Sequence, residues 1–277
     1  MTAQVALATC VQLPDLDEDG PALLAALAAQ GVHAEPVVWS SGADWATYDL
    51  VVVRSCWDYT TRRAEFLAWA ASVPRLANPA EVLAWNTDKR YLAGLAAAGV
   101  PVVPTTFVAP GEPFEVPAGE HVVKPTVSAG ARDTRRFAAG ESSAAHAAAL
   151  LAAGRDVMVQ PYVSGIEQAG ETAVLSFLGV HSHAIRKAPV LVDGTAVAPG
   201  VVAITPRTAS AAELAVAEQV RALVPGGPLL YARVDLVPGP GGPLLLELEV
   251  TEPSLFLGHA AGAADRLAAA VVERLRA

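Results

Sequence analysis

Two apolar segments are joined by a turn and interrupted by charged residues. The segments are YARVDLV (231–237) and LLLELEV (244–250), and PGPGGP lies between them. A turn so rich in Gly and Pro predicts that they pair as an antiparallel hairpin. Glu247 and Glu249 are two positions apart and therefore share one face of their strand, and Glu252 follows. Any fold for this chain must place positive charge beside a buried hairpin.

The predicted register brings four charged side chains to one face. If the hairpin is centred on Gly241, Asp235 faces Glu247 and Arg233 faces Glu249. Two carboxylates about 4 Å apart repel by roughly 4 kcal/mol at an effective dielectric near 20, so unpaired acids are costly there. Oxygen ligands without Cys or His suit a hard cation such as Mg²⁺, especially one also held by phosphate. The alternative is a self-neutralising cluster around Arg233 on a solvated face.

Composition excludes several classes of protein. The 277 residues are 53% apolar and 17% charged, which is enough for roughly two compact domains or one large domain. A net charge of −9 offers no basic face to nucleic acid or an anionic membrane. No apolar run reaches about 18 residues and no charged leader is present, so we expect a cytoplasmic protein, with a homodimer as the default state. Cys10 and Cys56 suit packed, reduced thiols, with a Cys56 nucleophile as the alternative.

The first hundred residues alternate between strand and helix patterns. Strands are expected at 4–10, 33–39 and 48–55, and helices at 20–31 and 61–73. This order predicts a parallel, doubly wound α/β unit. Ligands of such sheets gather beyond the carboxyl ends of the strands.

The segment RSCWDY follows the third strand and supplies candidates for a small-molecule pocket. These are Arg54, Trp57, Asp58 and Tyr59. In the alternative interpretation Asp58 only caps the next helix and Trp57 only packs.

Beyond this unit the pattern changes to α+β. A helix is expected at 86–100 and short strands at 101–108, 121–125, 134–137, 156–163, 172–179 and 181–189. Helices return at 210–224 and 262–277. The expected fold class is thus an α/β N-terminal parallel-sheet domain followed by α+β domains.

Candidate phosphate contacts lie in two places, although GxGxxG and GxxxxGK are both absent. Lys124 ends a strand and precedes PTVSAGARDT, where the backbone of Ser128, Ala129 and Gly130 can approach a polyphosphate. Lys89 in NTDKRYL is a second candidate, and a solvated helix lysine is the alternative. In VMVQPYVSGIE, a strand end at Gln160 precedes a carboxylate that suits ribose hydroxyls, unless the segment is an ordinary loop.

The order of these elements resembles the ATP-grasp superfamily, the carboxylate-amine ligases that include D-alanine–D-alanine ligase and glutathione synthetase. The most specific segments are QPYVSGIE (160–167) and RVDL…LELE (233–249). The resemblance spans the whole chain. It implies an N-terminal substrate-side domain (1–85), a small ATP-grasp subdomain with a phosphate-covering loop (86–160) and a C-terminal subdomain with the metal site (161–277). It also implies ATP and Mg²⁺, expected as two ions.

The resemblance also implies roles for individual residues. The ATP phosphates would be contacted by Lys89, Lys124, Ser128 and Gly130. Adenine would be bound by Gln160, Tyr162 and Val163, and ribose by Glu167. The Mg²⁺ ligands would be Asp235, Glu247 and Glu249. Where these ligases commonly have Glu-x-Asn, this chain has Glu247-x-Glu249, and Arg233 stands where a small residue is frequent. Arg233 would either balance a more anionic site or reach the transferred phosphate.

Several segments resemble a branch that includes the O-ureido-D-serine cyclo-ligase of D-cycloserine formation. Examples are RSCWDY, VVKPTVSAGARDT and ELEVTEPSLFL. The branch implies an amino-acid-like substrate whose carboxylate is activated as an acyl phosphate for attack by an amine-type nucleophile. His183, Arg186 and Lys187 would lie near the phosphates and acceptor, with exposed strand residues as the alternative. Other classes remain open, namely a non-catalytic ATP sensor and a small-molecule kinase.

Overall fold

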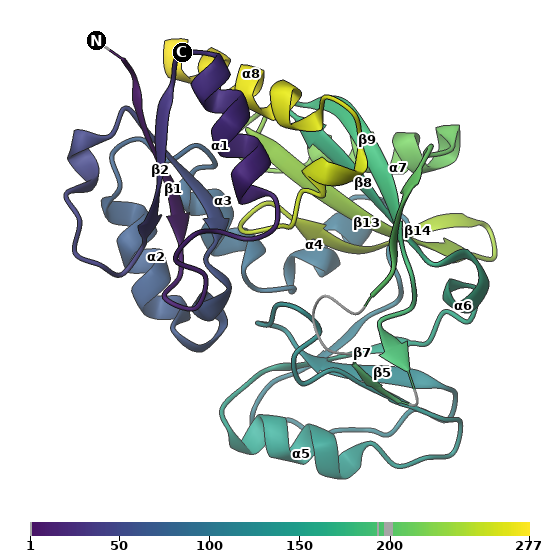
Figure 1. Ribbon diagram of the computed structural model, residues 1–277. Coiled ribbons are helices and arrows are strands. Elements are labelled where there is room, and N and C mark those ends of the chain that lie inside the picture. The colour runs from purple at the N-terminus through teal and green to yellow at the C-terminus, as the bar shows by residue number, and fades with distance from the viewer. Residues whose placement is uncertain (1, 193, 197–201) are drawn as a thin grey trace.

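The N-terminal part of the fold is a parallel sheet with a helix on each face (Figure 1). The computed structural model describes residues 2–192, 194–196 and 202–277. The sheet has the order β2-β1-β3, with β1 at Gln4–Thr9, β2 at His33–Val38 and β3 at Leu50–Ser55. Pro36 is tolerated because β2 is an edge strand. This confirms the predicted α/β unit.

Both faces of this sheet are buried, which explains its apolar strands. Val5 and Leu7 of β1 pack in one cluster with α1 (Gly20–Ala29), and Ala6 and Ala8 pack in another with α2 (Arg63–Ser72). Short 3₁₀ turns flank β3 at η1 (Trp45–Thr47) and η2 (Trp57–Thr61).

Two antiparallel sheets follow. The first has the order β10-β11-β6-β5-β7-β4, and its strands are β4 (Thr106–Val108), β5 (His121–Pro125), β6 (Arg135–Phe137), β7 (Val157–Pro161), β10 (Leu191–Val192) and β11 (Thr195–Ala196). Helix α5 (Ala144–Ala152) covers it, and α6 (Ile166–Ala169) leads to the next sheet. The second has the order β12-β9-β8-β13-β14, with β8 (Glu171–Phe177), β9 (Val180–Lys187), β12 (Ile204–Arg207), β13 (Tyr231–Gly239) and β14 (Gly242–Glu249).

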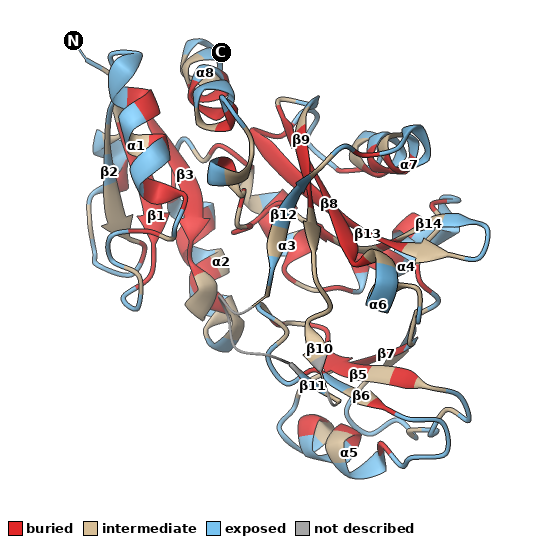
Figure 2. Cartoon of the chain, turned by 45° about the vertical axis from the view of Figure 1, so that its right-hand side comes forward, coloured by how far each residue is buried: buried red, intermediate tan, exposed pale blue. Residues whose placement is uncertain are grey.

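In the second antiparallel sheet, the inner strands β8 and β13 are buried along most of their length, whereas the edge strand β12 is not (Figure 2). Helix α7 (Ala211–Ala222) packs on one face, and its start is fixed by a capping box between Ser210 and Glu213. On the other side, η3 (Leu257–His259) and α8 (Ala263–Arg276) pack with α1 and the N-terminal sheet in one core cluster. The proposed division near residue 85 stays a prediction, and this apolar core crosses it.

The predicted helix over 86–100 is wrong at its start. Helix α3 (Ala80–Asn86) ends there, and α4 begins only at Tyr91 and runs to Ala97. The break arises because Asn86 Nδ2 donates to the Leu248 carbonyl at 2.8 Å and Lys89 N donates to the Thr126 carbonyl at 3.0 Å. Tertiary contacts therefore override local helix propensity.

The strand expected over 101–108 is also shorter than predicted, because only Thr106–Val108 joins a ladder and Val102 forms an isolated bridge with Leu245. Both cysteines are buried and unbridged, and burial raises the pKa of the Cys56 thiol, which agrees with packed thiols rather than a nucleophile. Within the described residues, no helix combines the length and apolar character needed to cross a bilayer.

Candidate active site

The β13–β14 hairpin presents its charged residues on one face. Asp235 pairs with Glu247 and Arg233 pairs with Glu249 in the ladder, as the sequence predicted. The tight end joins Gly239 and Gly242, and a register shift after Asp235 leaves one extra residue, Leu246, in β14. Without this bulge the glutamates would not face their predicted partners.

The opposite face of the hairpin explains why the charges are held in place. Val234, Leu236, Leu245 and Leu248 are almost fully buried in the cluster that contains α7. Because side chains alternate along a strand, burying these residues turns the acidic residues to the opposite face of the hairpin.

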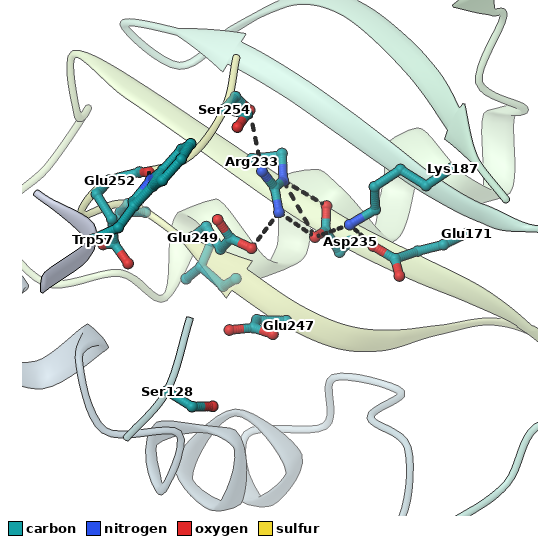
Figure 3. A network of polar contacts seen from close by, with 12 residues as sticks. Trp57, Ser128, Glu171, Lys187, Arg233, Asp235, Glu247, Glu249, Glu252 and Ser254 are labelled. Atoms are coloured by element: carbon teal, nitrogen blue, oxygen red, sulfur yellow. Dashed lines mark hydrogen bonds and ion pairs between the residues drawn. The ribbon is translucent and has the colours of Figure 1, made fainter. Parts of the chain in front are cut away.

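Arg233 joins the acidic residues of the hairpin (Figure 3). It donates to Asp235 from Nε at 2.9 Å and from Nη2 at 2.8 Å, and it forms an ion pair with Glu249. Its Nη1 also donates to the Ser254 carbonyl at 3.1 Å. Burial alone would lower the pKa of Arg233, but the attraction of Asp235 and Glu249 outweighs burial and raises it. Arg233 therefore stays charged in the site.

Lys187 is a second cation bound to Asp235. Its Nζ lies 2.8 Å from Asp235 Oδ2 and also forms an ion pair with Glu171. Burial would raise the pKa of Asp235, yet Arg233 and Lys187 hold it well below its ordinary value. Burial raises the pKa of Glu171 to about 8 against the pull of Lys187. Of the three residues predicted near the phosphates in β9, Lys187 is the one that the structure brings to the hairpin.

Lys89 connects the hairpin to the loop over 126–134, which was predicted to cover the phosphates. It forms a 2.9 Å ion pair with Glu247 Oε1 and donates to the Ser128 carbonyl at 2.7 Å. Lys124 is buried at the end of β5, close enough to Glu247 for the two charges to interact, and burial lowers its pKa. In the same loop Gly130 adopts a positive φ of 61°, which a side chain would disfavour. Lys89 and Lys124 thus lie beside Glu247, with the Ser128 carbonyl bonded to Lys89, and the phosphate role of Gly130 stays a prediction.

The carboxylate oxygens of the hairpin are suitable ligands for a hard cation, but in this structure they form ion pairs with lysine and arginine side chains. Among the described residues, no three or more His, Cys, Asp or Glu side chains form a ready metal cage. Asp235 is taken up by Arg233 and Lys187, whereas the ion pairs of Glu247 and Glu249 each use Oε1. Burial raises the pKa of Glu249 to about 7 against the attraction of Arg233. The metal roles stay predictions, with the two glutamates as the better placed ligands.

The residues predicted to bind adenosine lie at the end of β7. Gln160 is buried and donates to Thr105 Oγ1 at 2.9 Å. The amide of Tyr162 donates to the Glu120 carbonyl at 2.9 Å, and the carbonyl of Val163 accepts from Ile166. These contacts place the segment at the junction of the two antiparallel sheets, and its role in base binding stays a prediction.

Glu167, predicted to bind ribose, is held by a residue that the sequence did not single out. Arg136 forms 2.7 Å ion pairs with both Glu167 and Glu120, and its guanidinium stacks 3.5 Å from the Tyr162 ring centre. No pattern in RRF distinguishes Arg136 from its neighbour, so sequence reasoning missed it.

His183 and Arg186 hold backbone segments in this structure. His183 bonds to the Leu255 carbonyl through Nε2 at 2.9 Å and to Ser182 through Nδ1 at 2.8 Å, and burial lowers its pKa. Arg186 donates to the carbonyls of Ala169 and Gln168 at 2.7 and 3.1 Å. Their catalytic roles stay predictions without support from these contacts.

The predicted substrate residues separate into two environments. Arg54 is 1% exposed and faces Asp17 and Asp19 at 3.7 and 3.8 Å. Asp58 accepts from the Trp39 indole at 2.8 Å and does not cap the next helix, whose N-cap residue is Arg62, so the capping alternative is wrong. Tyr59 is buried with its hydroxyl bonded to Glu252, which directs it to the hairpin.

Two buried asparagines position the hairpin and were not predicted. Asn78 donates to the carbonyls of Tyr231 and Val250 and accepts from Leu230 N. Asn86 makes comparable contacts with β14. A polar residue inside an otherwise apolar stretch is the only sequence signal for such residues, and it does not identify the partner.

The chain matches one group of known proteins over nearly its full length. Residues 5–78 match the model of the N-terminal domain of D-cycloserine synthetase DcsG. The cycloserine biosynthesis protein DcsG of Streptomyces lavendulae is 42% identical over an alignment of 289 positions, gaps included. The alignment covers 96% of this chain and 96% of that protein. The chain belongs to the DcsG family.

Solved structures agree with membership of the DcsG family. The crystal structure of D-cycloserine synthetase DcsG has a TM-score of 0.91 and 40% identity, covering 99% of this chain and all of that one. A second structure is that of the ATP-grasp ligase PsnB complexed with a phosphomimetic variant of its minimal precursor, Mg and ADP. It has a TM-score of 0.65 and 20% identity, with 99% of both chains covered, which shows a similar fold. The predicted ATP-grasp fold and ligase class are confirmed.

Proposed function

We propose that this chain uses ATP and Mg²⁺ to activate the carboxylate of an amino acid and then closes a ring, as in the formation of D-cycloserine from O-ureido-D-serine. The γ-phosphoryl group would pass to a carboxylate oxygen of the substrate. An amine-type nitrogen of the same molecule would attack the acyl carbon and release phosphate. With O-ureido-D-serine this nitrogen carries a carbamoyl group, so hydrolysis must also remove that group, as carbon dioxide and ammonia, to give D-cycloserine. The observation that carries the proposal is the set of acidic residues on one face of the β13–β14 hairpin, next to Lys89 and Lys124.

Catalysis in this scheme is mainly electrostatic. Lys89 and Lys124 would contact the phosphates, and Arg233 would offset charge that develops on the transferred group. Glu247 and Glu249, with Asp235 behind them, would hold Mg²⁺, expected as two ions. Bound Mg²⁺ would offset the charge of the phosphate oxygens. No covalent nucleophile of the protein is required.

The loop over 126–134 would exclude water from the acyl phosphate. Val127 packs against the core cluster of the N-terminal sheet, and Arg132 Nη1 donates to Thr60 Oγ1 at 3.2 Å. Ser128 is tied to Lys89, a proposed phosphate contact. These contacts support a loop that closes over the site when ATP binds.

The substitution Glu247→Gln tests the proposal. It removes one carboxylate charge and preserves shape, so we expect ATP-dependent phosphate release to be lost while the unfolding temperature stays close to that of the wild type. Glu273→Gln, on the exposed side of α8, is the matched control and should retain activity. Full activity of Glu247→Gln would refute the metal assignment.

Product analysis decides between this function and the other classes. Amino acids, including O-ureido-D-serine, are supplied with ATP, and products are identified by mass spectrometry. A ligase gives ADP, phosphate and a ring or amide. A kinase gives a stable phosphorylated product, and a sensor binds ATP without turnover.

The remaining expectations concern the cellular setting. The proposal keeps a cytoplasmic location, no nucleic-acid partner and a homodimer. Light scattering of the purified protein measures the oligomeric state directly.

A further inference from the structure

Glu252 lies three residues after the glutamate pair of β14, in the loop that leads to η3. Its side chain is buried, with the residue 8% exposed. The Trp57 indole donates to its backbone carbonyl at 3.0 Å, and the Tyr59 hydroxyl bonds to its carboxyl group. Glu252 is therefore held between the hairpin and the turn that follows β3 (Figure 3).

Glu252 differs from the other carboxylates of the site in having no cationic partner. Glu171 and Asp235 pair with Lys187, Glu249 pairs with Arg233, and Glu247 pairs with Lys89. Among the described residues, Glu252 forms no ion pair within 4 Å. Burial, followed by the nearby charge of Glu249, raises its pKa to about 8. A buried carboxylate of this kind is destabilising unless a ligand supplies the missing positive charge.

Glu252 lies beside Glu249, the ion-pair partner of Arg233, at which the substrate carboxylate is proposed to bind. Arg233 and Glu249 lie on one side of it, and Arg233 also binds the Ser254 carbonyl in the same loop. Trp57 and Tyr59 lie on the other side. An α-amino acid carries its ammonium two bonds from the carboxyl carbon. A substrate with its carboxylate at Arg233 can therefore direct its ammonium to Glu252.

We infer that Glu252 binds the ammonium group of the amino-acid substrate and thereby selects substrates with a free amino group. The inference rests on the proposed function. Tyr59 acts as the positioning residue, because its hydroxyl fixes one side of the carboxyl group. The substrate ammonium would supply a direct ion-pair partner to Glu252, which the described residues influence only through the more distant charge of Lys89.

The test compares a free amino acid with its N-acetyl derivative. ADP release is measured for the wild type, Glu252→Gln and Glu252→Asp with O-ureido-D-serine and N-acetyl-O-ureido-D-serine, and Glu273→Gln is the surface control. Loss of a hydrogen bond between charged groups predicts a 10- to 100-fold fall, roughly, in kcat/KM of Glu252→Gln for the free amino acid. The KM for ATP should change less than about twofold, since Glu252 makes no proposed phosphate contact. Glu252→Asp should recover part of the loss.

Discrimination against the N-acetyl compound is the decisive readout. The wild type should prefer the free amino acid, and Glu252→Gln should lose most of that preference while its unfolding temperature is equal or higher. An unchanged preference in Glu252→Gln, with an active wild type, overturns the inference and leaves the proposed function standing. A wild type that releases no phosphate with either compound or with any other amino acid overturns both.

Discussion

The ammonium of Lys89 lies 2.9 Å from Glu247, and it also binds the carbonyl of Ser128. One side chain thus joins the broken helix region, the acidic hairpin and the loop over 126–134. Its position depends on the helix break after Asn86, because a continuous helix would not leave Lys89 N free to bond Thr126.

Lys89→Met should weaken ATP binding by about tenfold or more, because it removes a charged hydrogen-bond donor from the site. Isothermal titration with a non-hydrolysable ATP analogue and Mg²⁺ measures the change. Arg90→Met is the neighbouring control, since Arg90 pairs with Asp156 at 2.7 Å on the surface. Equal losses in both variants would contradict the assignment of Lys89.

Arg233→Met should destabilise the fold by about 3 kcal/mol or more, because it leaves Asp235 and Glu249 without their shared partner. Turnover should be lost as well. Urea unfolding and phosphate release measure the two effects. Arg233→Lys keeps the charge but not the bidentate geometry, so an intermediate result is expected. A fully stable, active Arg233→Met variant would rule out the structural and catalytic roles together.

Asn78→Ala should lower the free energy of unfolding by about 3 kcal/mol, since three buried backbone groups lose their partner. Gln219→Ala is a matched control, because Gln219 donates to the Gly99 carbonyl at 3.1 Å in an exposed position. The control should change stability by less than about 0.5 kcal/mol. A comparable small effect for Asn78→Ala would mean that water replaces these hydrogen bonds.

Glu252 should make the ligand-free protein less stable as pH rises. Its pKa is raised from 4.5 to about 8, so the native state binds more protons than the unfolded state between these values. The free energy of unfolding therefore falls between pH 4.5 and 8. Above pH 8 this group lowers it no further. The charged and titratable groups around it are Glu249, Lys89, Glu247 and Tyr59.

Unfolding in urea at pH 5, 7 and 9 measures this dependence. Glu252→Gln should show a smaller fall between pH 5 and 9 than the wild type. The variant keeps the pH dependence that Glu171 and Glu249 contribute, because the pKa values of these carboxyl groups are also raised, to about 8 and about 7. Identical pH profiles for the two proteins would show that Glu252 ionises without cost.

Local patterns were sufficient to predict the hairpin and the N-terminal sheet. Alternation placed Asp235 opposite Glu247, and continuous apolar runs predicted buried parallel strands. The ATP-grasp order of elements came from resemblance, and the fold was confirmed by the likeness to a solved ATP-grasp ligase. These features depend on residues close together in the sequence or on segments with distinctive composition.

Long-range polar contacts could not be predicted in the same way. The helix break at Asn86 depends on the Leu248 carbonyl, 162 residues away. Likewise, nothing in RRF shows that Arg136 binds Glu167, and the alternation in HSHAIRK did not show that His183 bonds to Leu255. Such partners become evident only when the chain is folded, because any of several polar groups could satisfy each residue.

The carboxylate of Asp19 binds the amides of Leu255 and Leu257, which follow it by 236 and 238 residues. During synthesis on the ribosome, the loop after β1 therefore cannot form these hydrogen bonds until Leu255 and Leu257 have been synthesised, near the end of the chain. Glu252 belongs to that late segment and receives its contacts from Trp57 and Tyr59 only then. A nascent chain can form the parallel sheet early, but it acquires the complete active site only in the last stage of translation.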